Sequence, residues 1–579
     1  MAILTHFFLD GTQGEDSVIL DVATFKSFAD LQNRIANAFS IARPDSLLLR
    51  SESGTLCSLE QVSQNGRISL LVDGRPVQAP PGPRELPLVG NHFELYPDPK
   101  GNYTRLFDRY GSVVRTTNMG TTIYITNDPR VSEVVLGETD YFTKATSDPS
   151  HPLHYMSDQT SLFSCDTASP AFKGAHKFIP PSMSPKAVKN FSPAMQNSVE
   201  ACFSVLDELD SKQQAFHVYQ YMFKLAGQII YRVVLGLDVQ HFQSPNTPPH
   251  EMIRLMGHYL ELLKQTSLSP QWYKYLPWGK VRQVDQVRQR LAVLVEAAVQ
   301  KCEPGGGNRD MPIQEAALNS TCIADYLRRA TDEGGNKLPH DHLISNLATL
   351  VGAGLNTSSS LLSWLIYALC KYPGNQDRLL QELVQFRRER EQDLSSAQDS
   401  PPTQQPYFMP WSHDDILSMP FLNAFVKETL RMHSPTFQTA RNTKRAVIVP
   451  GGWYIPAGAV VIPTFPAVHR NKDHWDNPER FEPDRWLTSS DNSKAVEASG
   501  RQHRMAYTPF AAGPRGCVGY NVAQLEAKLA LANLVYRYHF VDANTEPVEY
   551  DPEFVVIRPL NFYARAVKRT SWPEKKLAM

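Results

Sequence analysis

The chain has 579 residues, of which 42% are hydrophobic and 20% are charged, a composition typical of a globular protein with a large core. Its 58 basic and 59 acidic side chains give a formal net charge of −1 without blocks of like charge, which excludes a protein built to neutralise nucleic-acid phosphates. No apolar run approaches the ~18 residues of a membrane span and residues 1–10 lack a signal-peptide pattern, so we expect a soluble cytoplasmic chain, with peripheral membrane contact left open.

The first 75 residues indicate a small module of their own. Strand patterns occur at 5–9 and 17–22, an amphipathic helical stripe runs from Phe28 to Phe39, and two more strand patterns follow at 47–50 and 67–72. This order resembles a ubiquitin-like β-grasp, a small α+β fold. No catalytic cluster is present in residues 1–75, so a binding or packing role is expected for them.

A proline-rich linker is expected at residues 76–88, with Ala79-Pro-Pro-Gly-Pro83 at its centre. The third region, residues 89–570, is strongly helical in pattern. Two insertions, at 304–307 and 394–406, have the composition of exposed connections.

Seven cysteines are scattered along the chain without a Cys-x-x-Cys pair, and their number is odd. Neither a disulfide framework nor a zinc site is predicted from this pattern. A cysteine that takes part in chemistry is therefore expected to act alone.

An apolar helix is expected over residues 343–372. Its middle carries Val351-Gly-Ala-Gly-Leu-Asn-Thr-Ser-Ser-Ser360, in which each glycine costs about 1 kcal/mol relative to alanine. A purely structural account has to explain why these small and hydroxyl residues cluster.

A shorter helix is expected over residues 420–432. Glu428 and Arg431 lie three residues apart and share one face of it. Taken alone, such a pair is usually a surface ion pair that contributes little to stability.

The segment Phe510-Ala-Ala-Gly-Pro-Arg-Gly-Cys-Val-Gly519 is the most informative in the chain, and an amphipathic helix is expected directly after it, at 521–538. A helix start favours the thiolate form of Cys517, which is the form that binds a metal. The glycines permit tight turns and a close approach of the backbone to a flat cofactor, and Arg515 suits an anionic group. A buried structural cysteine in a glycine turn is the alternative for this segment by itself.

The complete spacing Phe-x-x-Gly-x-Arg-x-Cys-x-Gly resembles the haem-binding loop of the cytochrome P-450 superfamily. The resemblance covers about residues 80–570 and implies a mainly α fold with a small β part. It also implies haem b (heme b) as the cofactor, with Cys517 as the axial thiolate ligand of the iron. By the same resemblance Phe510 packs beside the thiolate, Gly513 lies close to the haem, and Arg515 meets a haem propionate.

A second segment matches the family in chain order. Glu428 and Arg431 resemble its Glu-x-x-Arg pair, whose partner arginine comes from a later loop that looks like Phe481-Glu-Pro-Asp-Arg-Trp486. This implies a structural triad of Glu428, Arg431 and Arg485, with Arg480 as the alternative third member. The role of the triad is stability rather than turnover.

The segment 351–360 resembles the oxygen-binding kink of the family's central helix. Ala353 and Gly354 would open the groove there, and Thr357 would be the alcohol of the proton-delivery pair. Where the family usually has an acid, this chain has Asn356, which can hold a water molecule but cannot titrate. Asn356 leaves room for chemistry that needs less proton delivery.

Two further residues match propionate partners of the family. The segment 162–184 resembles the helix that grips a propionate, which gives that role to His176 with Lys177 beside it. Arg441, ten residues after Arg431, matches a further propionate arginine.

Substrate contacts are expected from the loop 155–161, from 435–440, from 554–557, and from the helix over 343–372. The single residues proposed for the pocket are Val351, Ala353, Thr436, Phe437 and Val555. They are mostly apolar or small, which suits a lipophilic small molecule. Core packing is the alternative for each of them.

The resemblance implies a monooxygenase that inserts one oxygen atom from O₂ into a lipophilic small molecule, either from secondary metabolism or fatty-acid-like. The likeness is greatest to soluble fatty-acid hydroxylases that are fused to their reductase. Only about 60 residues follow Cys517, so we expect electrons from a separate NADPH-dependent flavoprotein reductase. A redox-neutral haem-thiolate isomerase or lyase, which Asn356 permits, and a scaffold protein with an incidental haem are the alternatives.

Overall fold

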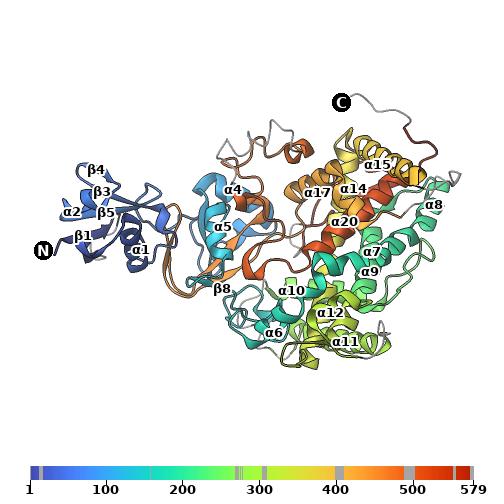
Figure 1. Cartoon of the computed structure of the whole chain (residues 1–579), viewed down its shortest axis with the longest axis horizontal. Helices are drawn as coiled ribbons and strands as arrows, with labels where there is room; N and C mark the ends of the chain where they lie inside the picture. Colours follow the sequence, from blue (N-terminus) through green and yellow to red (C-terminus); the bar gives the residue numbers. More distant parts are fainter. Residues whose placement is uncertain are drawn as a thin grey trace. The chain divides into compact units, whose positions relative to one another are not determined.

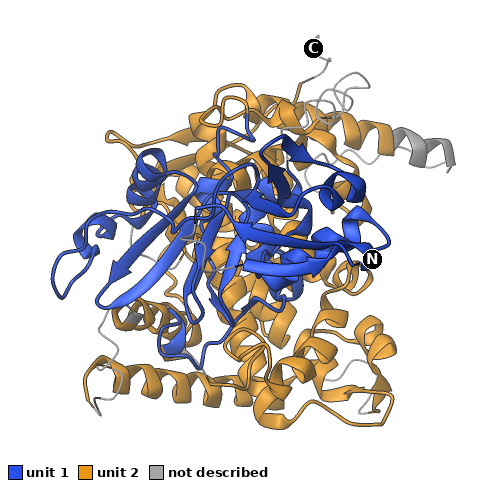
Figure 2. Ribbon diagram, turned by 90° about the vertical axis from the view of Figure 1, so that its left-hand side faces the viewer, with its two compact units in different colours: residues 1–154, 438–475, 501–516 blue, residues 155–437, 476–500, 517–579 orange. Residues whose placement is uncertain are grey.

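A computed structural model of the chain describes residues 2–11, 17–156, 158–267, 273, 276, 278–302, 309–397, 410–487, 503–551 and 556–573. The chain divides into two compact units, which Figure 2 shows in different colours. Unit 1 contains residues 1–154, 438–475 and 501–516, and unit 2 contains residues 155–437, 476–500 and 517–579. The two insertions predicted at 304–307 and 394–406 lie largely outside the described residues.

The N-terminal module of unit 1 is a five-stranded sheet covered by a helix (Figure 1). The strand order is β2-β1-β5-β3-β4, with β1 and β5 parallel and the other pairs antiparallel. The strands are β1 (Leu4–Leu9), β2 (Ser17–Asp21), β3 (Leu47–Ser51), β4 (Gly54–Leu56) and β5 (Arg67–Val72), and the helices are α1 (Phe28–Ala38) and α2 (Leu59–Ser63). The four predicted strands and the helix are present, and β4 and α2 are additional.

Alternation along β1 and the apolar stripe of α1 build the core of the module. Phe7, Leu31 and Ile35 have no exposed surface. Ser27 caps α1, since its hydroxyl oxygen accepts a hydrogen bond from the Asp30 N–H at 3.1 Å.

Apolar packing, backbone hydrogen bonds and an ion pair join the module to the rest of unit 1, in addition to the covalent connection. Ile448, which is 2% exposed, belongs to the module's apolar core. Its backbone pairs with the module at both sides, because the Ala42 N–H donates to the Ile448 carbonyl and the Ile448 N–H donates to the Ser40 carbonyl, each at 2.9 Å. An ion pair of 3.0 Å between Arg130 and Asp73 adds a charged contact.

The second sheet of unit 1 has the strand order β6-β7-β15-β12-β8, with β7 and β15 parallel. Its strands are β6 (Val113–Asn118), β7 (Thr121–Thr126), β8 (Phe142–Thr143), β12 (Arg441–Thr443) and β15 (Val460–Pro463), and β13 (Val447–Val449) and β14 (Trp453–Ile455) form a hairpin beside it. Besides α1 and α2 of the module, the helices of unit 1 are α3 (His92–Leu95), α4 (Pro99–Tyr110), α5 (Pro129–Leu136) and α18 (Phe465–Val468).

The proline-rich segment 76–88 is bound along this sheet. The Arg115 N–H of β6 donates to the Pro81 carbonyl at 2.8 Å, and Gln78 bridges to Trp453 of β14. A side chain at Gly82 would lie only 1.9 Å from the Arg115 carbonyl oxygen, so this close approach requires glycine.

Unit 2 is mainly helical and centres on the long helix α14 (His340–Lys371). α14 packs against α9, α11 and α20. The other helices are α6 (Pro170–Phe178), α7 (Pro185–Ala201), α8 (Phe203–Ser211), α9 (Val218–Leu235), α10 (Glu251–Ser267), α11 (Lys280–Lys301), α12 (Ile313–Asn319), α13 (Ile323–Arg329), α15 (Asn375–Ala397), α16 (His413–Ser418), α17 (Pro420–Met432) and α20 (Tyr520–Arg537).

The strands of unit 2 are few and short. They form a three-stranded sheet, β16 (Tyr538–Asp542), β17 (Tyr563–Lys568) and β9 (Phe216–His217), and the pair β10 (Met311–Pro312) and β11 (Ala330–Thr331). The predicted class, mainly α with a small β part after a small α+β module, is confirmed. Among the described residues, no helix is both long enough and apolar enough to span a membrane.

Candidate active site

Cys517 lies three residues before Tyr520, the first residue of α20, and Gly519 is the N-cap of that helix. Its side chain is exposed. Desolvation by surrounding protein raises the pKa of the Cys517 thiol, and a hydrogen bond from the Gly519 N–H acts in the opposite direction. The preference of the helix start for the thiolate stays a prediction, because the exposed surface of Cys517 and the desolvation of its thiol act in opposite directions on ionisation.

The loop before Cys517 is held from within unit 1. Gly513 has a φ of +71°, and a side chain there would lie 2.1 Å from the Leu136 carbonyl oxygen at the end of α5. His469 Nε2 accepts a hydrogen bond from the Thr508 N–H at 3.0 Å, and the Trp475 indole donates to the Ala506 carbonyl at 3.3 Å. His469 and Trp475 were not predicted, because hydrogen bonds to backbone atoms 30 or more residues away leave no local pattern in the sequence.

Arg441, the first residue of β12, is 1% exposed. Its Nη1 donates to the Ala440 carbonyl at 2.9 Å and to the Thr439 hydroxyl at 3.1 Å, and its Nε forms an ion pair with Glu138. Its Nη2 is buried and has no hydrogen-bond partner among the described residues. Burial lowers the pKa of Arg441, Glu138 opposes this, and Arg515 adds a further lowering.

This corner of unit 1 suits an anionic group. Two guanidinium groups, Arg441 and Arg515, interact there, and Glu138 balances one of them. A buried N–H donor without an acceptor is unfavourable, and a carboxylate is the acceptor that a guanidinium binds most strongly. The residues therefore fit a haem propionate. Phe510, in the same loop, is partly buried.

The predicted propionate residues of unit 2 lie on α6. His176 is exposed, and its ring centroid lies 5.2 Å from that of Phe172. Lys177 forms an ion pair of 2.8 Å with Asp332. Lys177 is therefore already paired with a carboxylate, whereas the side chain of His176 is exposed to solvent.

The small-residue segment of α14 is part of one uninterrupted helix. Ala353 is exposed and Thr357 partly exposed, although most of the helix around them is buried. The Thr357 hydroxyl donates to the Ala353 carbonyl at 2.6 Å. Asn356 is 2% exposed, and its Nδ2 donates to the Gly352 carbonyl at 3.2 Å. The side-chain hydrogen bond of Asn356 is therefore made within α14 itself.

Two neighbours of Ala353 have packing roles. A side chain at Gly354 would lie 2.4 Å from the Ile230 side chain of α9. This glycine therefore allows α9 to pack closely against α14, rather than opening a groove. Val351 has no exposed surface and packs in the core, which is the alternative that the sequence left open.

The segment with Thr436 and Phe437 pairs with the C-terminal loop. Thr436 bridges to Val556, and the Ile557 N–H donates to the Pro435 carbonyl at 2.9 Å. Both Thr436 and Phe437 are partly exposed. Val555 lies outside the described residues.

The loop that precedes α6 is bound to α14 by a partly buried polar network that the sequence did not predict. Asp158 accepts hydrogen bonds from the Ser164 hydroxyl at 2.5 Å and from the Ser345 hydroxyl at 2.9 Å. Asn346 Oδ1 accepts from the Leu162 N–H at 2.7 Å. This loop is thereby fixed against the part of α14 that carries Ser345 and Asn346.

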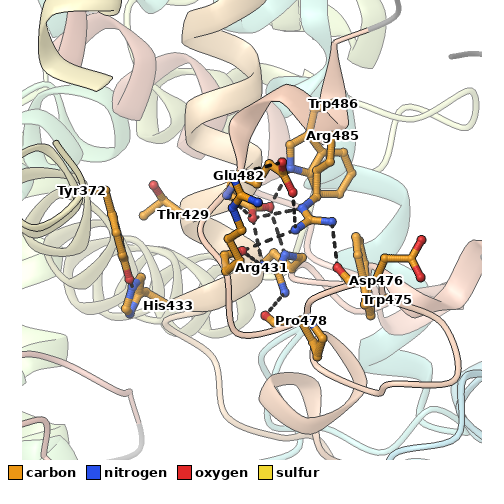
Figure 3. A network of polar contacts seen from close by, with 12 residues as sticks. Tyr372, Thr429, Arg431, His433, Trp475, Asp476, Pro478, Glu482, Arg485 and Trp486 are labelled. Atoms are coloured by element: carbon orange, nitrogen blue, oxygen red, sulfur yellow. Dashed lines mark hydrogen bonds and ion pairs between the residues drawn. The ribbon is translucent and has the colours of Figure 1, made fainter. Parts of the chain in front are cut away.

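Glu428, Arg431 and Arg485 come together in one buried network (Figure 3). Arg431 donates to both carboxylate oxygens of Glu428, at 2.8 and 2.9 Å, and Arg485 Nε donates at 3.1 Å. The Trp486 indole and the Glu482 N–H complete the carboxylate's contacts, at 2.9 and 2.8 Å.

Backbone carbonyls complete the arginine side of this network. Arg431 donates to the carbonyls of Pro478 at 2.7 Å and Arg480 at 3.0 Å. The Arg480 side chain itself is 70% exposed, so Arg480 takes part through its backbone and Arg485 supplies the guanidinium.

Comparison with known proteins adds four findings. A family model described as Cytochrome P450 matches residues 80–565. Cytochrome P450 monooxygenase alnD of Emericella nidulans is 48% identical over 571 residues, which are 98% of this chain and 99% of that protein. Human cytochrome P450 4F2 is 31% identical over 253 residues, or 44% of each chain. The crystal structure of the cytochrome P450DA heme domain superposes with a TM-score of 0.70 at 21% identity, over 85% of this chain and 98% of that one.

Proposed function

This chain belongs to the cytochrome P450 family, and we propose that it inserts one oxygen atom from O₂ into a lipophilic small molecule of secondary metabolism. Family membership and the full-length similarity to alnD make it a haem-thiolate monooxygenase, which requires O₂ and a redox partner. The isomerase, lyase and scaffold alternatives are not favoured, because the relative that aligns with nearly the whole chain is named a monooxygenase.

We propose haem b as the cofactor, with Cys517 as iron ligand, Arg441, Arg515 and His176 toward the propionates, and Phe510 and Gly513 beside the haem. The observation that carries this assignment is the buried Arg441 guanidinium, whose Nη2 has no acceptor among the described residues. When bound, the haem iron supplies the activation of O₂ and the transfer of one oxygen atom.

In this proposal, side chains of α14 take part in proton delivery. Thr357 Oγ1 carries a proton at the accessible face of α14, where it now donates to the Ala353 carbonyl. Asn356 donates to the Gly352 carbonyl and cannot titrate, so we propose that water supplies the protons that an acid would otherwise relay.

The proposed substrate class rests on the character of the predicted contact residues. Ala353 and Phe437 present apolar surface and Thr436 a single hydroxyl, which suits a ligand held with few polar anchors. Electrons are proposed to come from a separate NADPH-dependent flavoprotein reductase.

We also propose that residues 1–75 and 89–570 are two domains joined by residues 76–88. The family model begins at residue 80, which supports this boundary. The catalytic role belongs to the second domain, and a packing role suits the module, because it shares its core with Ile448.

The test uses full-length protein purified with haem. The reduced carbon monoxide spectrum should be of the thiolate type and should be lost in Cys517→Ala, but kept in the matched control Cys57→Ala, which changes an exposed cysteine of the module. With a reductase and a ligand found by a spin-state screen, NADPH and O₂ should be consumed with an oxygenated product. A thiolate-type spectrum in Cys517→Ala would overturn the assignment, and a product formed without O₂ consumption would overturn the proposed reaction.

A further inference from the structure

The structure brings two cysteines together that lie 20 residues apart in the sequence. Cys302 directly follows α11 and Cys322 is the N-cap of α13. Their sulfur atoms are 3.3 Å apart, and the two residues are 7% and 0% exposed. Neither cysteine forms a disulfide in the structure. That these two lie together was not predicted from the sequence, from which a cysteine that takes part in chemistry was expected to act alone.

A glycine at the end of α9 leaves room for the two sulfur atoms. Gly236, the C-cap of α9, has a φ of +70° and lies against both. A side chain on Gly236 would be 3.2 Å from the Cys322 sulfur and 3.6 Å from the Cys302 sulfur. A residue other than glycine would therefore crowd the pair and strain the backbone.

Hydrogen bonds hold the two helix ends in place. Arg328 of α13 donates to the Cys302 carbonyl at 3.1 Å and to the Val299 carbonyl at 3.2 Å, which joins the end of α11 to α13. The Asp325 N–H donates to the Cys322 sulfur at 3.4 Å, and Asp325 is itself fixed by a buried ion pair of 2.7 Å with Arg329.

A disulfide needs a sulfur–sulfur distance of about 2.05 Å, so the two atoms must approach by roughly 1.3 Å from their separation of 3.3 Å. Rotation of the side chains and small shifts of two chain ends outside the regular helices supply such a movement. The hydrogen bond with Cys322 lowers the pKa of Cys302, whereas the same bond and burial raise the pKa of Cys322. Cys302 is therefore the sulfur that ionises first.

We propose that Cys302 and Cys322 are an oxidisable dithiol that a hydroperoxide converts to a disulfide between the end of α11 and the start of α13. The Cys302 thiolate attacks hydrogen peroxide, the O–O bond breaks, and the sulfur becomes a sulfenic acid with release of hydroxide. The Cys322 sulfur then displaces the sulfenic hydroxyl, which leaves as water. In sum, two thiols and one hydrogen peroxide give one disulfide and two waters.

The bond would tie together elements that pack on the central helix. α11 and α13 both contact α14 and α9. Closing the chain between residues 302 and 322 restricts the unfolded chain more than the folded one, so oxidation should raise the resistance of unit 2 to unfolding. This role is separate from the proposed monooxygenase chemistry and does not depend on it.

Thiol mapping on the haem-loaded full-length chain tests the proposal. Protein carrying Cys57→Ser, which removes the exposed thiol of the module, is treated with hydrogen peroxide, blocked with iodoacetamide in denaturant, and digested without reduction. We expect one cross-linked peptide pair that contains Cys302 and Cys322 and is lighter by two hydrogens than the two reduced peptides. It should disappear after reduction.

Two variants provide the controls. Cys322→Ser should leave Cys302 as a sulfenic acid that a dimedone probe labels, and Cys202→Ser, at a buried cysteine elsewhere in unit 2, should leave the cross-link unchanged. The Tm should rise on oxidation in the Cys202→Ser protein and not in Cys322→Ser. Recovery of Cys302 and Cys322 as two alkylated thiols after peroxide treatment, or a cross-link of either one to another cysteine, would overturn the proposal. The cross-link result in the Cys57→Ser protein is sufficient to decide the proposal, even if Cys322→Ser or Cys202→Ser fails to fold.

Discussion

Arg431 and Arg441 are both buried arginines, with 0% and 1% of their surface exposed, but their surroundings differ. In unit 2, Arg431 uses Nε, Nη1 and Nη2 as donors to Glu428 and to two backbone carbonyls. In unit 1, Arg441 keeps an Nη2 without an acceptor among the described residues. A buried guanidinium whose three nitrogens all donate holds a structure together, whereas the Arg441 nitrogen without an acceptor supports the proposal of a ligand at that place.

Glu428→Ala should have the largest effect, because it leaves the buried Arg431 guanidinium and the Arg485 guanidinium without their carboxylate. Loss of one partner of a buried pair costs about 3–5 kcal/mol, so we expect much lower stability with and without haem. Urea unfolding followed by circular dichroism measures it.

Arg480→Ala is the matched control for this network, since its side chain is 70% exposed and only its carbonyl takes part. Its effect should stay within about 0.5 kcal/mol. If both substitutions changed stability equally, the network would not be the structural centre that its hydrogen bonds indicate.

Glu526 of α20 is a third case, because a buried acid can avoid an unpaired charge by staying protonated. Burial raises its pKa to about 8, the Ser358 hydroxyl donates to Oε2 at 2.8 Å, and Oε1 has no partner among the described residues. The unfolded chain ionises this group near 4.5, so the stability of the folded state should fall as pH rises from about 4.5 to about 8.

Glu526→Gln should remove that slope, which is at most about 1.4 kcal/mol per pH unit. Unfolding free energies measured at several pH values between 5 and 8 test it, with Glu546→Gln at an exposed position as the control. Parallel slopes in wild type and Glu526→Gln would show that the carboxyl is ionised in the folded state.

The double variant Arg441→Gln, Glu138→Gln should act mainly on the ligand. It removes both charges of the pair, so no unpaired buried charge remains. Haem affinity should fall at least about tenfold, a loss of about 1.4 kcal/mol, whereas the apoprotein should lose less stability than in Glu428→Ala. Haem transfer to apomyoglobin measures the first quantity and urea unfolding the second. Unchanged haem affinity would remove the contrast between the two arginines.

Asp158→Asn should have the smallest and most local effect. Burial acts to raise the pKa of Asp158, but hydrogen bonds from Ser164, Thr160 and Ser345 outweigh it and lower the pKa below its ordinary value of 3.8. The network is therefore intact above the ordinary carboxyl range and is lost only as pH falls through the lowered pKa.

Hydrogen exchange at neutral pH should rise in residues 158–166 of this variant by about tenfold, since one charged hydrogen-bond acceptor is lost. Asp332→Asn, in an exposed turn, is the control. Unchanged exchange in residues 158–166 would mean that Asn346 alone fixes this loop.

The sequence was most informative where function or folding depends on fixed spacing. The spacing around Cys517 and the pattern at 481–486 identified Arg515 and separated Arg485 from the exposed Arg480. The module's four longer strands and α1 were predicted, but β4 and α2, of three and five residues, are too short for their periodicity to be recognised.

Contacts between distant residues could not be predicted. Glu138 meets Arg441 across about 300 residues, Trp486 reaches Glu428 across 58, and Cys302 meets Cys322 only because the end of α11 lies beside the start of α13. The desolvation that raises the pKa of Cys517 could not be predicted either, because it depends on packing that one local segment does not reveal.

The position of Ile448 determines when, during synthesis, the apolar core of the module can be completed. The module ends at residue 75, but one residue of its apolar core is made 448 − 75 = 373 residues later. At about 5–20 residues per second, translation takes roughly 20–75 s to cover that distance. During this interval the nascent module lacks one residue of its apolar core, so this core is complete only after residue 448 has been made.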